Sequence, residues 1–189
     1  MKQRRAHSVV ATAVLMELAL AAIGLALGAM AGIRPLDSFS WSPRDTAIGA
    51  AAALPLLVVF RLAWRSSVPA LRKIRDELER LLPEMFATTS TAGLAVVSLA
   101  AGVGEEILFR GFLQGWLETI LGSFGGLVMA SWLFGAAHPI TAGYIVVATL
   151  MGAYLGALWQ VSGNLMVPIV THALYALVVL RVLLGGLRR

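Results

Sequence analysis

The amino-acid sequence predicts an all-α membrane protein, a bundle of about six transmembrane helices with one amphipathic helix at the interface. Hydrophobic residues make up 59% of the 189 residues and charged residues only 13%, whereas a soluble domain averages about 25% charged. The apolar residues form runs close to the roughly 20 residues that a helix needs to cross a bilayer. Composition and run length therefore place the chain among membrane proteins.

Six apolar runs are predicted to span the membrane. They cover about residues 9–33, 46–64, 91–120, 127–138, 141–159 and 167–184, and the fourth has an alternative start at Ser123. The first run is longer than the ~7–15 residues of a signal-peptide core, so we expect an uncleaved helix. The fourth ends at Pro139, because proline removes a backbone donor and restricts the preceding residue. Gly152 and Gly156 predict a close approach between helices.

The segment between the second and third runs differs in composition. Leucine and isoleucine recur there at three- and four-residue spacing among charged side chains. This pattern predicts an amphipathic helix that lies at the interface or on neighbouring helices. The chain therefore divides into residues 1–90, with two transmembrane helices and the amphipathic cytoplasmic segment, and residues 91–189, a core of about four transmembrane helices.

Basic residues predict how the chain is oriented. Lys2, Arg4 and Arg5 precede the first span, six basic residues surround the amphipathic segment, and Arg188 and Arg189 end the chain. With six spans all three groups fall on one side, which the positive-inside rule makes cytoplasmic. We thus expect both termini in the cytoplasm and, for a bacterial protein, a multi-pass location in the inner membrane. The basic residues behind the net charge of +5 are interpreted as topology signals and not as a nucleic-acid-binding surface. The expected partner is the lipid bilayer.

Three charged side chains interrupt the third run: Glu105, Glu106 and Arg110. An ionised group near the middle of a spanning helix costs about 2.5–3.5 kcal/mol on insertion scales. Arg110 follows Glu106 by four residues, the spacing and order of a favourable helical ion pair. Glu105 lies about 100° away around the helix, so it need not share that contact. We expect Glu105 to be the freer carboxylate and the better general base.

Two histidines lie within the spans, His138 at the end of the fourth and His172 in the sixth. If spans three, four and six converge, Glu105, His138 and His172 meet in one cavity. For either histidine alone, packing or a hydrogen bond to a neighbouring backbone is an equal alternative. The chain has no cysteine, which excludes thiolate nucleophiles and cysteine-ligated metals.

The order of these residues forms three motifs on separate spans. They are Glu105, Glu106 and Arg110 in Glu-Glu-x-x-x-Arg, Phe134 and His138 in Phe-x-x-x-His, and Asn164 and His172 in a third, histidine-containing segment. Together they resemble the CAAX protease and bacteriocin-processing (CPBP/Abi) family of intramembrane glutamic-type endopeptidases. The resemblance covers about residues 95–180, so residues 91–189 look like the catalytic core.

The resemblance implies an endopeptidase that hydrolyses a peptide bond at membrane depth or near its surface. Glu105 would activate a water with help from His138, His172 would help to stabilise the oxyanion, and Glu106 with Arg110 would support them. The implied substrate is a membrane-embedded or lipidated peptide, or a C-terminal tail. No cofactor is implied.

One position departs from the family pattern. An Asn often stands four residues after the last histidine, and this chain has Ala176 there. Loss of one oxyanion donor costs about 10²–10³ in rate. Either His172 and an unidentified donor suffice, or Asn164 or Tyr175 substitutes, or the protein is slow or inactive.

Three alternatives stay open from the sequence. Two imidazoles and a carboxylate, His138, His172 and Glu105, are a sufficient ligand set for zinc, which would give a zinc-dependent form of the same hydrolysis. A non-catalytic scaffold or immunity-type protein would keep the polar cluster as a structural network, and Ala176 favours it. Glu17, in the first span, is either a proton-relay group or a solitary carboxyl, protonated or bonded to a neighbouring helix.

Overall fold

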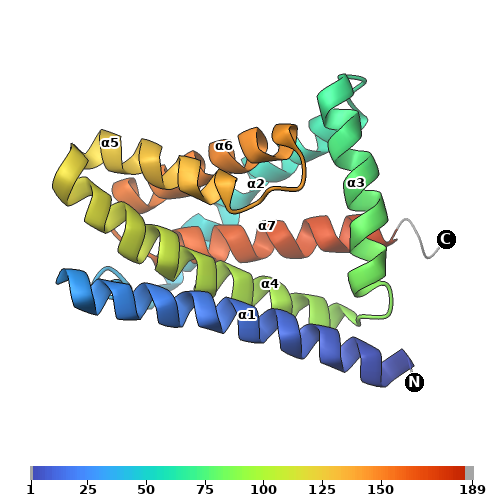
Figure 1. Ribbon diagram of the computed structural model, residues 1–189, viewed down its shortest axis with the longest axis horizontal. Helices are drawn as coiled ribbons and strands as arrows, with labels where there is room; N and C mark the ends of the chain where they lie inside the picture. Colours follow the sequence, from blue (N-terminus) through green and yellow to red (C-terminus); the bar gives the residue numbers. More distant parts are fainter. Residues whose placement is uncertain (1, 186–189) are drawn as a thin grey trace.

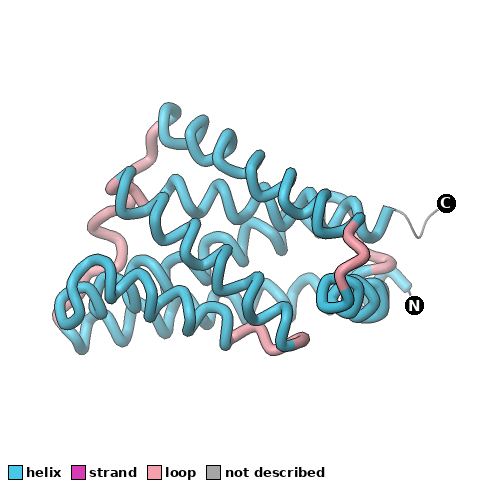
Figure 2. Tube along the Cα trace, turned by 90° about the horizontal axis from the view of Figure 1, so that it is seen from above, coloured by secondary structure: helices cyan, strands magenta, loops and turns pink. Residues whose placement is uncertain are grey.

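The computed structural model describes residues 2–185, with side chains from residue 7 onward, and this part of the chain is helical with no strand (Figure 2). The predicted all-α class is confirmed. The helices are α1 (Lys2–Ala31), α2 (Pro43–Arg65), α3 (Pro69–Phe86), α4 (Thr91–Glu106), the π-helix η1 (Ile107–Gln114), α5 (Gly115–Ala136), α6 (Ala142–Ser162) and α7 (Met166–Gly185). The basic side chains at residues 2–5 and 188–189, used above for topology, lie outside the described residues.

Five helical stretches are long and apolar enough to cross a membrane. They are His7–Ala31, Pro43–Arg65, Thr91–Ala136, Ala142–Ser162 and Met166–Gly185. The stretch Thr91–Ala136 joins α4, η1 and α5, and it breaks at Gly122, where φ is +72°. Glycine reaches this backbone region without a steric penalty, and the chain folds back there (Figure 1). The six predicted runs therefore occupy five stretches, because the third and fourth are the two arms of one helical hairpin.

The bundle brings the two halves of the chain into direct contact. Helix α1 packs along α4 and η1, and α2 packs along α7. Helix α7 also packs on α4, and the α5 arm packs on α6 (Figure 1). The boundary proposed at residue 90 stays a prediction. Helices α1 and α2, which precede it, pack directly against α4, η1 and α7, which follow it.

Glycines set the closest approaches around α4. A Cβ atom at Gly102 would lie 2.8 Å from the carbonyl oxygen of Ile169 on α7. A Cβ atom at Gly104 would collide with the carbonyl oxygen of Glu17 on α1. Without side chains at these two positions, α4 is held between α1 and α7 at backbone distance. The two residues that follow Gly104 are thereby fixed in the interior.

Helix α3 is the predicted amphipathic helix. It buries Ile74 and Phe86 and exposes most of its charged side chains, with Arg80 paired to Glu77 at 2.8 Å. It crosses the end of the bundle at which α1 begins and α7 ends (Figure 1). This arrangement puts the described basic residues of α3 at the same end of the bundle as the start of α1 and the end of α7. Which side of a membrane this end faces stays a prediction.

Candidate active site

Two consecutive carboxylates end α4, and a π-helix follows them. Glu105 and Glu106 are the last residues of α4, and η1 begins at Ile107. π-Helical turns are rare and occur frequently at functional sites, because the extra residue in each turn redirects side chains. Arg110 lies in this widened turn. The sequence analysis did not predict this π-helix.

The inner group consists of Glu106, Arg110 and His172. The Glu106 side chain is fully buried, and its Oε1 accepts a hydrogen bond of 2.8 Å from Arg110 Nη1. The same oxygen lies 2.8 Å from His172 Nδ1. The predicted ion pair is confirmed, and His172 adds a third member, since it bonds to Glu106 and not to Glu105. Three charged or polar side chains from α4, η1 and α7 thus meet at one oxygen, Oε1 of Glu106, in the interior.

Arg110 is also held by α6 and α5. Its Nη2 donates to the carbonyl oxygen of Gly152 at 3.0 Å, and its guanidinium carbon lies 4.5 Å from the centre of the Phe134 ring. One turn later, Gln114 lies against α6 at Gly156, where a Cβ atom would be 2.5 Å from Gln114 Oε1. The predicted role of Gly152 and Gly156 in close packing is confirmed. These glycines also leave room for polar side chains to reach the backbone of α6.

The outer pair consists of Glu105 and His138. Their side chains are 11% and 27% exposed, and His138 Nε2 lies 3.6 Å from Glu105 Oε2. On its other side, the ring places Nδ1 2.7 Å from the carbonyl oxygen of Phe134. A carbonyl only accepts, so Nδ1 carries the hydrogen and Nε2 is the atom that faces Glu105.

The two members of the outer pair do not hydrogen-bond to each other. The 3.6 Å separation of His138 and Glu105 exceeds the length of a hydrogen bond. In the neutral histidine Nε2 is an acceptor, as is an ionised carboxylate, and two acceptors make no hydrogen bond to each other. A water that donates one hydrogen to each satisfies both groups.

Phe134 contacts a residue of each group. It is 2% exposed, and its ring centre lies 4.7 Å from that of His138 and 6.1 Å from that of His172. Phe109 packs on it edge-on at 5.0 Å. The Phe-x-x-x-His motif therefore has a geometric basis: the phenylalanine carbonyl orients the histidine one turn later, and its ring packs against both histidines.

Asn164 is the predicted site residue that joins neither group. Its amide nitrogen donates to the backbone oxygen of Ser40 at 2.9 Å and to Asp45 Oδ2 at 2.7 Å. Its Oδ1 accepts from the backbone nitrogens of Ser40 and Met166. Asn164 fastens the segment before α2 to the turn between α6 and α7. With both ends of the amide engaged there, the expectation that it replaces a donor at position 176 has no support.

Tyr144 is a site neighbour that the sequence analysis missed. It lies on α6, its ring centre is 6.4 Å from that of His138, and its hydroxyl is within electrostatic reach of Glu105. Tyr175, the other donor considered, packs edge-on against Phe60 at 6.5 Å and lies close to Tyr144. The only sequence signal was a tyrosine six residues after His138 inside an apolar run.

A zinc site does not fit the arrangement of these side chains. Within residues 7–185 no three His, Asp or Glu side chains form a group able to hold a metal ion. His172 turns its Nδ1 to Glu106, while His138 faces Glu105. Glu105, His138 and His172, which the sequence offered as a ligand set, are thus divided between two separate groups.

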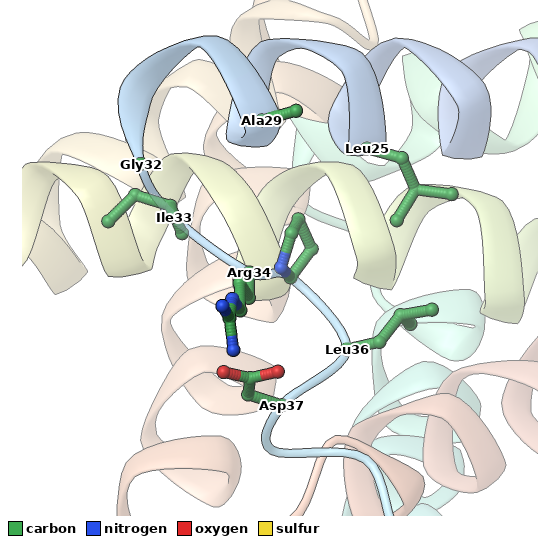
Figure 3. A pocket seen from close by; sticks show the side chains of 8 residues that line it. Leu25, Ala29, Gly32, Ile33, Arg34, Leu36 and Asp37 are labelled. Carbon is green, nitrogen blue, oxygen red and sulfur yellow. The ribbon is translucent and has the colours of Figure 1, made fainter.

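One hollow lies away from both groups. It measures about 540 Å³ and is bordered by the end of α1 and the loop that follows, where the Arg34 and Asp37 side chains face each other (Figure 3). None of the predicted site residues lines it. The residues that border this hollow include no member of the outer pair or the inner group, so the hollow is not part of the candidate active site.

The comparisons with known proteins give one family. Residues 87–178 match the family described as type II CAAX prenyl endopeptidase Rce1-like. The matched segment starts just before α4 and ends within α7, so it contains the outer pair and the inner group but none of α1, α2 or α3. Neither the curated proteins nor the solved structures gave a match.

Proposed function

Because residues 87–178 match the Rce1-like type II CAAX prenyl endopeptidase family, we propose that this protein is an intramembrane endopeptidase. Its substrate is a membrane-embedded or lipidated peptide, such as a C-terminal tail that carries a prenyl group. The observation that carries this proposal is the outer pair, a carboxylate and an oriented imidazole 3.6 Å apart. That pair combines a general base with an oriented hydrogen-bond acceptor, two groups that can bind and activate a hydrolytic water.

The proposed reaction uses one water molecule and leaves Glu105 unchanged. Glu105 removes a proton from the water while Nε2 of His138 holds the other hydrogen. The oxygen forms a bond to the carbonyl carbon of the scissile peptide and gives a tetrahedral oxyanion. Glu105 then transfers its proton to the leaving nitrogen, the carbon–nitrogen bond breaks, and a new carboxyl end and a new amine are released.

The proposal gives the inner group the task of balancing charge beside this reaction. Glu106 and Arg110 compensate each other, so the helix carries them into the bilayer at lower cost. His172 spans from Glu106 toward the reacting centre and donates to the oxyanion. Its Nδ1 already bonds to Glu106, so in that role the ring carries a proton on both nitrogens. Donors that meet the developing charge are worth about 10²–10³ in rate each.

The proposed location follows from the helices and the basic residues. The protein crosses the membrane several times, with α3 at the cytoplasmic surface and both chain ends on that side. A prenylated tail would then reach the site from the leaflet that already holds its lipid. The reaction as proposed needs no metal.

The test is cleavage of a quenched fluorescent peptide that ends in a farnesylated cysteine and three further residues. We expect purified wild-type protein in liposomes to release the three-residue product, and Glu105→Gln and His138→Ala to lower kcat by at least about 10³- and 10²-fold. Thr12→Val, on the exposed face of α1, is the matched control and should cleave as wild type does. A retained melting temperature shows that each variant is folded.

Each alternative predicts a different result in the same assay. Cleavage by Glu105→Gln at the wild-type rate would refute the mechanism. Stoichiometric metal in the active protein, together with inhibition by a chelator, would favour zinc-dependent hydrolysis. A scaffold that only retains the polar cluster would show no cleavage of any lipidated peptide, and Glu105→Gln would leave its cellular phenotype unchanged.

A further inference from the structure

Glu17 is an acidic residue at membrane depth to which the proposed mechanism gives no role. It lies in the middle of α1, outside the segment that matches the family. A charged or ionisable side chain in this position is expensive and almost always faces the interior of a bundle or a polar cavity. The surroundings of Glu17 therefore indicate what it does.

The backbone places Glu17 beside the catalytic end of α4. The carbonyl oxygen of Glu17 occupies the space that a Cβ atom at Gly104 would need, and Gly104 directly precedes Glu105. One turn further along α1, Ala21 packs with Ile107 of η1 and Ile169 of α7. This face of α1 thus points toward the junction of α4, η1 and α7, where the inner group lies.

The charges of the site act on the Glu17 carboxyl group from two sides. Glu105 on α4 and His172 on α7 both act electrostatically on the Glu17 carboxyl group, and their effects are opposite in sign. Glu17 is therefore within electrostatic reach of one member of the outer pair and one member of the inner group.

Hydrogen bonding points to the same connection. Oε2 of Glu17 is buried and makes no hydrogen bond, and the same holds for Oε2 of Glu105 and of Glu106. A buried polar oxygen left without a partner costs about 1–3 kcal/mol, and more when it is charged. A water molecule between two of these carboxyl groups satisfies an oxygen on each.

We propose that Glu17 is a positioning residue of the active site, which holds the Glu105 carboxylate in its orientation toward His138 through a shared water molecule. Glu17 itself does not touch the substrate. The catalytic consequence of this inference rests on the proposed function. The water-mediated link between the two carboxyl groups does not depend on that function. The first half of the chain then completes a site whose other residues all lie in the matched segment.

A double-mutant cycle on stability tests the contact without any substrate. Glu17→Leu, Glu105→Leu and the double variant are unfolded thermally in detergent, and the shifts in melting temperature are compared. Coupled residues deviate from additivity, and we expect a deviation of about 2 °C or more. Additive shifts would overturn the inference.

The matched control pair is Glu17→Leu with Glu118→Leu. The Glu118 carboxylate is held by Gln114 and Gln160, and it follows Glu105 by 13 residues, roughly 20 Å along a helix. The shifts of this pair should add, which shows that a deviation in the first cycle comes from proximity. A deviation of equal size in both cycles would also overturn the inference.

Cleavage of the farnesylated peptide then tests the positioning role. Glu17→Leu, which keeps the size but makes no hydrogen bond, should lower kcat at least about tenfold with KM changed less than twofold. Glu17→Gln should retain at least a third of the wild-type kcat, because its amide still binds a water. Wild-type kcat in Glu17→Leu, or equal losses in the two variants, would refute positioning.

The two arms separate this inference from the proposed function. If wild-type protein cleaves no lipidated peptide, the proposed function fails, while the stability cycle still decides whether Glu17 and Glu105 are in contact. If Glu17→Leu does not fold, the comparison of kcat and KM is made on Glu17→Gln and Glu17→Ala. In that comparison the alanine variant alone should lose kcat.

Discussion

Replacing Arg110 by methionine removes a buried positive charge while keeping most of the side chain's volume. Arg110 is 2% exposed. It makes an ion pair to Glu106 at 2.8 Å, a hydrogen bond to Gly152 at 3.0 Å and a ring contact with Phe134. The substitution leaves the Glu106 carboxylate buried with His172 as its remaining partner. Breaking a buried pair by removing one partner costs about 3–5 kcal/mol.

The expected loss is large enough to measure by thermal unfolding in detergent. For a chain of this length 1 kcal/mol corresponds to about 2–4 °C, so Arg110→Met should lower the melting temperature by roughly 6–20 °C. The double variant Glu106→Gln, Arg110→Met removes the stranded charge and should recover part of that loss.

Two results would refute this reasoning about the inner group. The first is a melting temperature for Arg110→Met within about 2 °C of wild type, which would mean that Glu106 is not charged when paired. The second is a double variant as unstable as the single one, which would mean that packing on Phe134, and not the ion pair, carries the stability.

Two further predictions concern the neighbours of the site. Tyr144→Phe removes a hydroxyl near the outer pair. If that hydroxyl supplies the donor that Ala176 lacks, kcat on the farnesylated peptide should fall about 10- to 100-fold with the melting temperature unchanged. An unchanged kcat would exclude Tyr144 as the donor. Gly104→Ala inserts a methyl group against the backbone of α1 and should destabilise the protein by about 1–3 kcal/mol, as measured by thermal unfolding. Gly185→Ala, where no atom lies within 4 Å, is its control and should change stability by less than about 0.5 kcal/mol; equal effects of the two alanines would contradict the close contact of α1 with α4.

The amino-acid sequence by itself determined the helical class, the membrane-spanning runs and the amphipathic α3, because these depend on hydrophobic periodicity and run length. It also identified the Glu106–Arg110 pair, whose members are four residues apart on one helix. These features are local, and local spacing is visible in a linear chain.

Only the tertiary structure decided how the polar residues are divided. His172 joined Glu106 instead of Glu105, Asn164 turned away to bind Ser40 and Asp45, and Tyr144 entered the site from α6. These outcomes depend on which faces of α4, α6 and α7 meet, and backbone approach at glycines such as Gly102 sets that geometry.

The same reason explains Glu17, which the sequence left between a proton relay and a solitary carboxyl. Its position beside Glu105 follows from the contact of α1 with Gly104. The two residues are 88 positions apart by number, a separation at which no periodicity of the sequence links one helix to another. Long-range packing between spans therefore decided which of the buried charges can act together, whereas the sequence alone determined that buried charges were there.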